Sequence, residues 1–337
     1  MGGARGFERR LVAGSGLPYQ ELVVRSLRSG ERDVHLVLDP LRLGGSIPQA
    51  WWLLGRLAPR AIFTTGGYLA IPLVLAARAR GIPTLVWEGN VMPGRATRAI
   101  GRFATRVAVS FPPTLPAFGT NAFVSGTPIR SFQGIDRVAA RERFGIGTDD
   151  RLLLIFSGSQ AGRRLNAALE TALPSLLDGW RVLHVAGDEE MSRAEALRGR
   201  LPSVLRDRYQ PEPFLTDAMA AALVAADLVV GRAGSSTCAE VAAVGVASIL
   251  VPYPFAGAHQ ALNAAYLADA GAARLVPDAE LDGERLLSEA TALRDDTRRE
   301  TMARAALALG RPEAAATLAD ALLALAERRL PAAGSAA

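Results

Sequence analysis

Residues 152–166 read LLLIFSGSQAGRRLN: an apolar run, a small turn that contains glycine, and the polar start of a helical segment. Such a turn lets backbone N–H groups approach a phosphate at the positive end of the helix dipole. The hydroxyl of Ser159 would add a further hydrogen-bond donor. The same pattern also fits a tight strand-to-helix connection that binds nothing, and this stretch by itself leaves both interpretations open.

The rest of the chain repeats this arrangement of apolar run, loop and helical segment. We predict buried strands at the apolar runs 61–64, 84–87, 106–109, 152–156, 182–185, 228–230 and 248–251. The segments between them have helical periodicity and are rich in Ala, Leu and Arg. Strands that alternate with helices predict an α/β fold with parallel sheets covered on both faces.

The length of 337 residues is sufficient for two domains of ordinary size. Residues 129–150 have the character of a connection, because they contain a charged segment, 136–143, with the length of a short helix. We therefore predict a first domain over residues 1–135 and a second domain over residues 145–311. The amphipathic helix expected at residues 312–330 would pack back onto the first domain.

All 38 basic side chains are Arg, and the formal net charge is +5. This charge favours weak attraction to anionic surfaces, either phosphate ligands or acidic lipids. No basic run is interleaved with aromatic residues, so nucleic acid is not expected as a partner. The single cysteine, Cys238, excludes an internal disulfide and indicates a reducing compartment. No signal peptide and no apolar run of about 18 residues is visible, so we expect a soluble or peripheral cytoplasmic protein.

A second strand–turn–helix stretch, DLVVGRAGSSTCAE, covers residues 227–240. Residues Ser235–Thr237 either cap the helix or turn their backbone amides toward a diphosphate. Glu240 lies one turn further on, where its carboxylate would accept both hydroxyls of a ribose or would simply be solvated. Two such turns in one domain favour a nucleotide ligand more than either turn alone. Cys238 is expected to be a packed small residue, since no His lies nearby in sequence.

A third stretch, VPYPFAGAHQALN, covers residues 251–263. Gln260 and Asn263 are three apart and share a helix face, and their amides suit the hydroxyls of a sugar. In the first domain, Thr65-Gly66-Gly67-Tyr68 and Glu88-Gly89-Asn90 directly follow predicted strands. Open α/β sheets bind ligands at these strand ends, so both stretches are candidate parts of a site.

No Asp-x-Asp pair, Cys/His cluster or P-loop pattern occurs in the sequence, so neither a metal ion nor a cofactor is expected. The charge of an anionic ligand would then be stabilised by helix ends and Arg side chains. Arg130, at the predicted domain connection, either faces such a ligand or lies on the surface.

Residues 40–56, PLRLGGSIPQAWWLLGR, join two Trp and several aliphatic residues to Arg. Arg95, Arg98, Arg102 and Arg106 follow in a second segment. Apolar residues flanked by Arg suit an interfacial contact with an anionic membrane surface. The alternative, which the sequence alone favours slightly, is an ordinary amphipathic core helix.

Taken together, a series of motifs resembles those of the MurG family over nearly the whole chain. The motifs are Thr65-Gly66-Gly67-Tyr68, Glu88-Gly89-Asn90, Gly126-Thr127-Pro128-Ile129-Arg130, Gly158-Ser159-Gln160, Arg232-Ala233-Gly234-Ser235-Ser236-Thr237 and His259-Gln260-Ala261-Leu262-Asn263. The resemblance implies two Rossmann-like domains facing a cleft, the GT-B arrangement, without a bound metal. It also implies inverting transfer of N-acetylglucosamine from UDP-N-acetylglucosamine to undecaprenyl-diphosphate-muramyl pentapeptide. This lipid-linked acceptor belongs to peptidoglycan synthesis at the cytoplasmic face of the membrane.

The resemblance also assigns roles residue by residue. Ser159 would contact the donor diphosphate, and Leu215 would present its backbone to the uracil. Glu240 would hold the ribose, while Asn90 and Arg130 would reach the donor across the cleft. The remaining candidates are the phosphate cradle and the residues that read the sugar, namely Ser235, Ser236, Thr237, Cys238, Ala239, Gln260 and Asn263. The stretches rich in Trp and Arg would match the membrane-facing patch of the family.

The chain departs from the family pattern at Gly89, where the family has Gln, and at Thr127, where it has Asn. Residues 1–8 are expected to begin directly in a loop, and the family's opening strand and Gly-Gly-Thr-Gly-Gly-His loop are missing from the sequence. The first domain is therefore expected to be N-terminally incomplete, and residues 1–337 are expected to show little turnover. Glu88 is a candidate replacement for the general base that this loop would supply.

Other activities stay open at this point. The alternatives are another GT-B enzyme, such as a lipid glucosyltransferase or a UDP-sugar 2-epimerase, and a donor-binding remnant without catalysis. The apolar and Arg-rich segments favour transfer to a lipid over epimerisation, because an epimerase needs no lipid-linked substrate.

Overall fold

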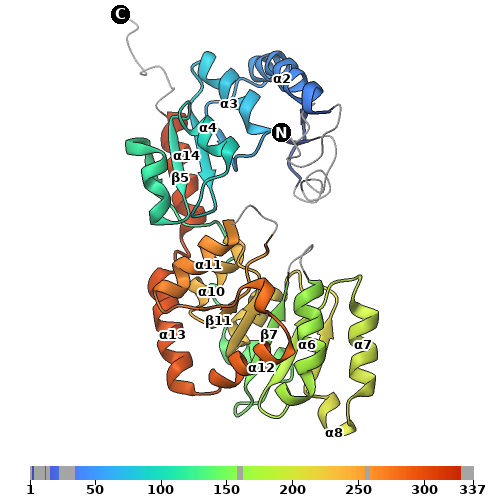
Figure 1. Cartoon of the computed structure of the whole chain (residues 1–337). Coiled ribbons are helices and arrows are strands. Elements are labelled where there is room, and N and C mark those ends of the chain that lie inside the picture. Colours follow the sequence, from blue (N-terminus) through green and yellow to red (C-terminus); the bar gives the residue numbers. More distant parts are fainter. Residues whose placement is uncertain are drawn as a thin grey trace, which may run out of the picture. The chain divides into compact units, whose positions relative to one another are not determined.

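The computed structural model describes residues 2–3, 12, 16–22, 35–157, 162–254 and 259–327. The chain forms two compact units, each of which is seen in Figure 1. Unit 1 comprises residues 1–126 together with 315–337, and unit 2 comprises residues 127–314. Each unit contains its own parallel sheet, which confirms the α/β fold expected from the alternation of apolar runs and helical segments.

The main sheet of unit 1 has four parallel strands in the order β3-β4-β5-β6. The strands are β3 (Ile62–Thr64), β4 (Thr84–Glu88), β5 (Arg106–Val109) and β6 (Ala122–Val124). The central strands β4 and β5 are almost wholly buried, as expected for apolar strands in a parallel sheet with both faces covered. Because all four strands run in one direction, their carboxyl ends lie along the same edge of the sheet.

Helices cover this sheet, and one of them comes from the far end of the chain. The helices are α2 (His35–Leu57), α3 (Ala70–Ala79), α4 (Arg95–Gly101) and α14 (Ala314–Glu327), with 3-10 turns at Pro112–Ala117 and Gly119–Asn121. On α14, Leu318 and Leu325 belong to one buried cluster with Leu85 of β4 and Ala108 of β5. The C-terminal helix therefore completes part of the hydrophobic core of unit 1.

A short parallel pairing lies near the N-terminus of unit 1. β1 (Gly2–Gly3) pairs with β2 (Glu21–Leu22). The expectation of a loop over the first residues is therefore wrong for Gly2 and Gly3. The reason is that strand pairing uses backbone hydrogen bonds and needs no apolar side chain to signal it. Residues 4–8 lie outside the described part of the chain.

The sheet of unit 2 has six parallel strands in the order β12-β11-β10-β7-β8-β9. The strands are β7 (Leu152–Phe156), β8 (Arg181–Val185), β9 (Tyr209–Glu212), β10 (Leu228–Gly231), β11 (Ala247–Leu250) and β12 (Arg274–Leu275). β7, β10 and β11 are buried at every residue, which accounts for their uninterrupted apolar sequences.

In unit 2, helix α6 packs against α12, and helix α10 packs against both α13 and α11. The helical elements are α5 (Arg137–Arg143), α6 (Arg163–Leu176), α7 (Met191–Arg200), α8 (Ser203–Arg206), α9 (Met219–Ala225), α10 (Ser235–Val244), α11 (His259–Asp269), η3 (Asp278–Glu280), α12 (Gly283–Ala292) and α13 (Asp296–Leu309). Leu169 and Leu173 of α6 join Trp180 and the apolar side chains of β7 in a large buried cluster.

The order of strands in unit 2 reverses at one place. From β7 the chain proceeds through β8 to β9 on one side, and then returns so that β10 lies on the other side of β7. A reversal of this kind leaves a crevice at the carboxyl ends of the two strands, where open α/β sheets bind ligands. The fold therefore places the candidate ligand site of unit 2 at the ends of β7 and β10.

The boundary between the units lies at residues 126/127, earlier than the predicted end of the first domain at residue 135. Arg137 and Arg141 of α5 each form an ion pair with Asp227, at 2.7 Å and 3.0 Å. Oδ2 of Asp227 also accepts a hydrogen bond from the backbone N of Leu152 at 2.7 Å. These bonds tie the connecting segment to the sheet of unit 2. The sequence does not indicate this pairing, because α5 and Asp227 are far apart along the chain.

Candidate functional site

The two turns that contain glycine begin side by side in unit 2. Phe156, the last residue of β7, pairs with Gly231, the last residue of β10. A Cβ on Gly231 would lie 3.2 Å from the backbone O of Phe156, so glycine allows the close approach of the two strand ends. The first turn, residues 158–161 with Ser159, lies outside the described residues, so its predicted phosphate contact stays a prediction.

The second turn leaves the start of α10 without a side-chain cap. Gly234 is the N-cap residue in an extended conformation and, as a glycine, has no side chain that could cap the helix. The N-cap position is therefore held by Gly234 and not by Ser235, Ser236 or Thr237, which lie inside the first turn of the helix. Because the first N–H groups of a helix have no acceptor within it, they are available to an anion at this end.

Glu240 lies on α10 and is buried, with only 6% of its surface exposed. Its Oε1 accepts a hydrogen bond from Nε of Arg130 at 2.7 Å, and Nη1 of Arg130 donates to the carbonyl O of Thr216 at 3.2 Å. Leu215, next to Thr216, lies half-buried in the loop between β9 and α9. The fold thus brings together Glu240, Arg130 and Leu215, which are far apart in sequence.

Two candidate residues lie beneath the turn rather than on its surface. The side chain of Cys238 is fully buried, and burial raises the pKa of its thiol to about 12, which excludes a thiolate nucleophile at neutral pH. Asn263 is also fully buried, and its Nδ2 donates to the carbonyl O of Ala233 at 3.2 Å. The amide of Asn263 therefore supports the turn, whereas the sequence pattern suggested a residue facing a sugar.

Gln260 is the other amide of the pair. Its Oε1 accepts a hydrogen bond from the backbone N of Tyr253 at 2.9 Å, which fixes the side chain and directs the amide NH2 group elsewhere. Arg232 is a supporting residue that the sequence did not single out. It is buried, and its Nη1 lies 2.5 Å from Oδ1 of Asp278 and 3.3 Å from the carbonyl O of Val251. These bonds hold the α10 turn against the neighbouring loops.

A chain of buried polar side chains lies at the start of α6. Nε2 of His184 lies 3.1 Å from Oδ1 of Asn166, and Nδ1 lies 2.9 Å from the hydroxyl of Tyr209. Because an amide oxygen only accepts, Nε2 of His184 carries the proton and Nδ1 accepts from Tyr209. Asn166 lies in the first turn of α6, and its backbone N donates to the carbonyl O of Gly162. The chain of bonds therefore anchors α6 at the point where the first turn ends.

The burial of His184 predicts a pH dependence of stability. Burial lowers the pKa of His184 from 6.5 to about 4, so the unfolded chain takes up a proton that the folded chain does not. The contribution to stability is present above pH 6.5 and is lost as the pH falls toward 4. Between pH 6.5 and pH 5 we expect the free energy of unfolding to fall by about 2 kcal/mol from this group.

Urea denaturation at both pH values, on the native chain and on His184→Gln, measures this contribution. The variant, which keeps hydrogen-bonding groups but has no proton to take up, should show a drop smaller by about that amount. An equal drop in both proteins would contradict the assignment.

Unit 1 holds two loops at the carboxyl ends of its strands. Gly66 and Gly67, after β3, have φ values of +80° and +77°, and a Cβ on Gly66 would collide with Oγ1 of Thr97. After β4, Oε1 of Glu88 accepts from the backbone N of Asn90 at 3.0 Å and from its Nδ2 at 3.2 Å. Oε2 of Glu88 accepts from the backbone N of Gly94 at 3.0 Å. The first loop therefore depends on the glycines of its motif, and the second loop is held by hydrogen bonds to Glu88.

These bonds correct the role considered for Glu88. Its side chain is 4% exposed, and both carboxylate oxygens are committed to the loop that carries Asn90. A general base must lie within hydrogen-bond reach of the acceptor hydroxyl, and a buried carboxylate that already accepts three hydrogen bonds from its own loop is poorly placed for this. Glu88 is therefore a positioning residue for Asn90 and not a replacement base.

With this geometry in place, the comparisons with known proteins are decisive. The Glycosyltransferase family 28 N-terminal domain matches residues 1–109, and the Glycosyltransferase family 28 C-terminal domain matches residues 152–318. The UDP-N-acetylglucosamine--N-acetylmuramyl-(pentapeptide) pyrophosphoryl-undecaprenol N-acetylglucosamine transferase of Desulforudis audaxviator is 37% identical over 329 residues. The match covers 95% of this chain and 88% of that relative. The chain belongs to the MurG family of glycosyltransferases.

Solved structures agree with this assignment. The crystal structure of Acinetobacter baumannii MurG matches with a TM-score of 0.74 and 28% identity, over 96% of this chain and 89% of that chain. The family resemblance and the GT-B fold class are thereby confirmed. A UDP-GlcNAc 2-epimerase from Neisseria meningitidis bound to UDP-GlcNAc matches with a TM-score of 0.59 and 12% identity, over 88% of this chain and 84% of that chain. At that identity the epimerase shares the fold alone.

In this MurG-family chain, α2 exposes two tryptophans on the face opposite its buried residues. Trp51 and Trp52 are 43% and 59% exposed, whereas Leu53 and Leu54 belong to a buried cluster. The guanidinium of Arg80, on the neighbouring helix α3, lies 4.2 Å from the ring centroid of Trp51, and that of Arg56 lies 5.6 Å from the centroid of Trp52. We call Trp51, Trp52, Arg56 and Arg80 the Trp–Arg patch. One face of α2 is core, as expected for an amphipathic core helix, whereas the membrane contact predicted for the exposed face stays a prediction.

The arginines of the second segment divide into two groups. Arg95, Arg98 and Arg102, on or next to α4, are exposed. Arg106 instead lies half-buried on β5, with its guanidinium 4.7 Å from the ring centroid of Phe123. Arg106 is therefore not part of an exposed basic surface, because the strand turns it against an aromatic neighbour.

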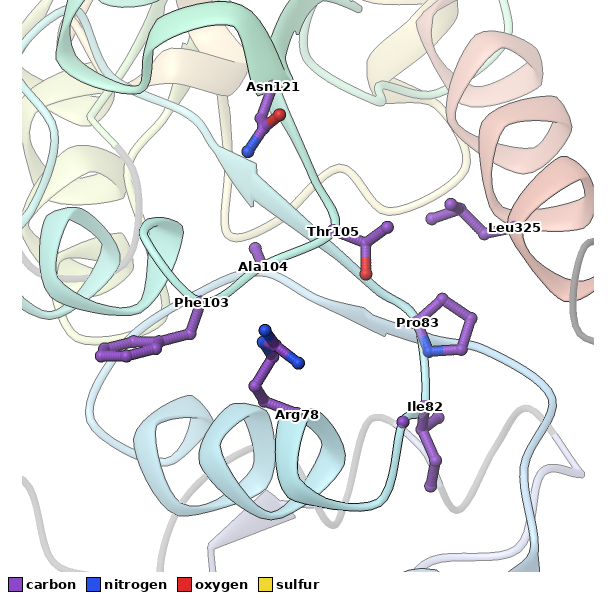
Figure 2. Close-up of a pocket in the computed structure, with 9 residues that line it drawn as sticks. Arg78, Ile82, Pro83, Phe103, Ala104, Thr105, Asn121 and Leu325 are labelled. Atoms are coloured by element: carbon purple, nitrogen blue, oxygen red, sulfur yellow. The ribbon is translucent and has the colours of Figure 1, made fainter.

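A hollow of about 470 Å³ lies in unit 1 near the amino-terminal ends of β4 and β5. Arg78, Phe103, Thr105, Asn121 and Leu325 are among the residues that line it, and Figure 2 shows how their side chains lie. Ligands of open α/β sheets bind at the carboxyl ends of the strands, so this hollow is not the expected place for a nucleotide.

Two further observations concern metals and membranes. Among the described residues, no group of three His, Cys, Asp or Glu side chains is placed to hold a metal ion. Over the same part of the chain, every helix is too short or too polar to cross a membrane.

Proposed function

We propose that the chain transfers N-acetylglucosamine from UDP-N-acetylglucosamine to the lipid-linked muramyl pentapeptide, which converts lipid I to lipid II in peptidoglycan synthesis. The observation that carries the proposal is the position of Glu240. Its buried carboxylate lies on α10, whose uncapped start is at the strand reversal of the unit 2 sheet. A carboxylate next to an anion-binding helix start is the arrangement that holds the ribose and phosphates of a nucleotide.

The proposal assigns the described residues of unit 2 to parts of the donor. The backbone N–H groups at Ser235–Thr237 bind the diphosphate, and Glu240 accepts the ribose hydroxyls. The backbone of Leu215 binds the uracil, and the NH2 group of Gln260 donates to a sugar hydroxyl. The supporting residues are those already tied to the protein, with Asn263 holding the turn from beneath. Ser159 and Asn90 complete the set by their match to the family motifs.

The chemical step follows from this placement. A hydroxyl of the acceptor attacks the anomeric carbon and loses its proton to the solvent, the bond from that carbon to the UDP oxygen breaks so that UDP leaves, and the configuration at the carbon inverts. Negative charge accumulates on the leaving diphosphate. In this proposal the start of α10 stabilises that charge, together with the guanidinium of Arg130 once it has moved from Glu240 to the diphosphate.

Mass spectrometry of the products tests this function. We expect the disaccharide-linked lipid when the chain is supplied with UDP-N-acetylglucosamine and the lipid-linked muramyl pentapeptide. Formation of UDP-N-acetylmannosamine without transfer would support the epimerase alternative. Donor binding without either product would contradict the proposed transfer and support the non-catalytic alternative.

The proposal places this reaction at the cytoplasmic face of the membrane, with the Trp–Arg patch in contact with anionic lipid. The patch combines exposed indole rings with guanidinium groups, the combination that suits an interface between acyl chains and charged headgroups. The exposed Arg side chains beside α4 extend the basic surface, since α3 packs against both α2 and α4.

Exchange of both tryptophans, Trp51→Ser with Trp52→Ser, should weaken binding to phosphatidylglycerol vesicles about tenfold or more, because each indole loses the stabilisation of apolar burial. Co-sedimentation with vesicles measures the binding. Val204→Ser, at a residue of α8 that is 80% exposed, is the matched control for loss of an exposed apolar side chain. Binding at the native level in the double variant, or an equal loss in the control, would contradict the contact.

A further inference from the structure

Arg130 forms an ion pair with Glu240, the carboxylate that we propose for the ribose. Its Nε donates to Oε1 of Glu240 at 2.7 Å, and its Nη1 donates to the carbonyl O of Thr216 at 3.2 Å. The guanidinium therefore spans from the carboxylate proposed for the ribose to the segment proposed for the uracil. The side chain of Arg130 is 39% exposed and that of Glu240 is 8% exposed, so Arg130 lies on the solvent side of a buried carboxylate.

The pair matters because the carboxylate of Glu240 is buried. Among the described residues, Arg130 is the side chain that donates a hydrogen bond to this carboxylate. A buried charge without a partner is strongly unfavourable, so Glu240 does not release Arg130 unless other donors replace it. Two ribose hydroxyls are such donors, since a carboxylate accepts from both of its oxygens.

The balance of this exchange depends on what the ligand offers to Arg130. Uridine replaces an ion pair on Glu240, in which both partners are charged, with two bonds from uncharged hydroxyl groups, and it leaves the guanidinium without an anion. UDP makes the same replacement but supplies a diphosphate, and bonds between guanidinium and phosphate are among the stronger ones in proteins. The exchange is therefore unfavourable for a nucleoside and favourable for a nucleoside diphosphate.

We propose that Arg130 is a specificity-determining residue that closes the ribose acceptor Glu240 in the empty site and releases it only to a ligand that carries phosphate. This inference rests on the donor site proposed above, and it adds the reason why that site selects nucleotides over nucleosides. Uridine and other nucleosides without phosphate are excluded by competition with a side chain of the protein. The same guanidinium then passes to the diphosphate, so one residue both guards the ribose site and binds the leaving group.

Opposite changes in the affinities of two ligands test this role. In Arg130→Met, which removes the charge and keeps an unbranched side chain, we expect uridine to bind about threefold to tenfold more tightly than to the native chain. UDP should bind about tenfold or more weakly, because its diphosphate loses a charged partner. Ligand-observed NMR titration measures uridine, and isothermal titration calorimetry measures UDP.

Two further variants separate the charge from other effects. Arg130→Lys keeps a cation beside Glu240 and should leave uridine at its native weakness. Arg143→Met, an exposed arginine of α5, is the control for removal of a positive charge and should change neither affinity. Melting curves of all variants establish that each is folded before its titration is interpreted.

The outcomes distinguish this inference from the proposed function. Weaker UDP binding together with unchanged or weaker uridine binding in Arg130→Met would overturn the guarding role and leave the donor site standing. A gain for uridine of equal size in Arg130→Lys would also overturn it. Absence of binding of any uridine nucleotide to the native chain would overturn the donor site and this inference together.

Discussion

Replacement of Glu240 with alanine is expected to raise the Kd for UDP-N-acetylglucosamine by about 100-fold. A hydrogen bond from a ribose hydroxyl to the carboxylate contributes about 1.5 kcal/mol at the lower end of the range for charged acceptors, so the loss of both costs about 3 kcal/mol, or slightly more than 100-fold in Kd. The fold should survive, because the loss leaves Arg130 without its carboxylate but with its other bond, to the carbonyl O of Thr216. Isothermal titration calorimetry with the donor, and with UDP, measures the change without requiring turnover.

Two companions define the origin of this effect. Glu240→Gln keeps one oxygen that accepts hydrogen bonds and should lose less affinity than the alanine variant. Glu142→Ala, at an exposed glutamate of α5, controls for removal of a negative charge from unit 2. Donor binding at the native level in Glu240→Ala would remove the ribose assignment, and with it the observation on which the proposed function depends.

Replacement of Glu88 with alanine is expected to destabilise unit 1 by about 3 kcal/mol, since three donors lose a charged acceptor in a half-buried loop. These donors are the backbone N and Nδ2 of Asn90 and the backbone N of Gly94. The loop that carries Asn90 should lose its conformation, so the rate of transfer should fall as well. Urea denaturation followed by tryptophan fluorescence measures the destabilisation, and Trp87, which precedes Glu88 in β4, is one of the four tryptophans that contribute to the signal.

Glu88→Gln distinguishes positioning from catalysis. Its amide oxygen still accepts from Asn90, whereas its NH2 group cannot accept from Gly94, so we expect an intermediate loss of stability and partial recovery of transfer. Asn121→Ala, at an exposed residue of the same unit, is the control. Native stability combined with complete loss of transfer in Glu88→Gln would indicate a catalytic carboxylate and contradict the positioning role.

The central strands of the two larger sheets are predictable from the sequence, whereas three of their four edge strands are not. β5 and β7 coincide with the apolar runs at residues 106–109 and 152–156, because strands covered on both faces must be apolar throughout. β6, β9 and β12 have no such run, and each lies at the edge of its sheet. β9 even contains Pro211, which an edge position tolerates because one side of the strand needs no ladder hydrogen bond.

Sequence patterns also predict only part of the candidate site. Local patterns place Glu240 one helical turn after a glycine turn, and this position can be deduced from spacing alone. The partner of Glu240 cannot, because Arg130 is 110 residues away and reaches it only through the fold. Burial also decides roles that spacing leaves open: Gln260 and Asn263 share a helix face, yet Asn263 is fully buried against Ala233. Sequence patterns therefore indicate the ligand, while the division of labour among the residues requires the structure.

A crystal structure of the chain with UDP-N-acetylglucosamine tests the central claim most directly. The account predicts the diphosphate at the start of α10, the ribose hydroxyls on the carboxylate of Glu240, and Arg130 moved from Glu240 to the phosphates. Nucleotide density at any other place, or a ribose bound while Arg130 still pairs with Glu240, would contradict it.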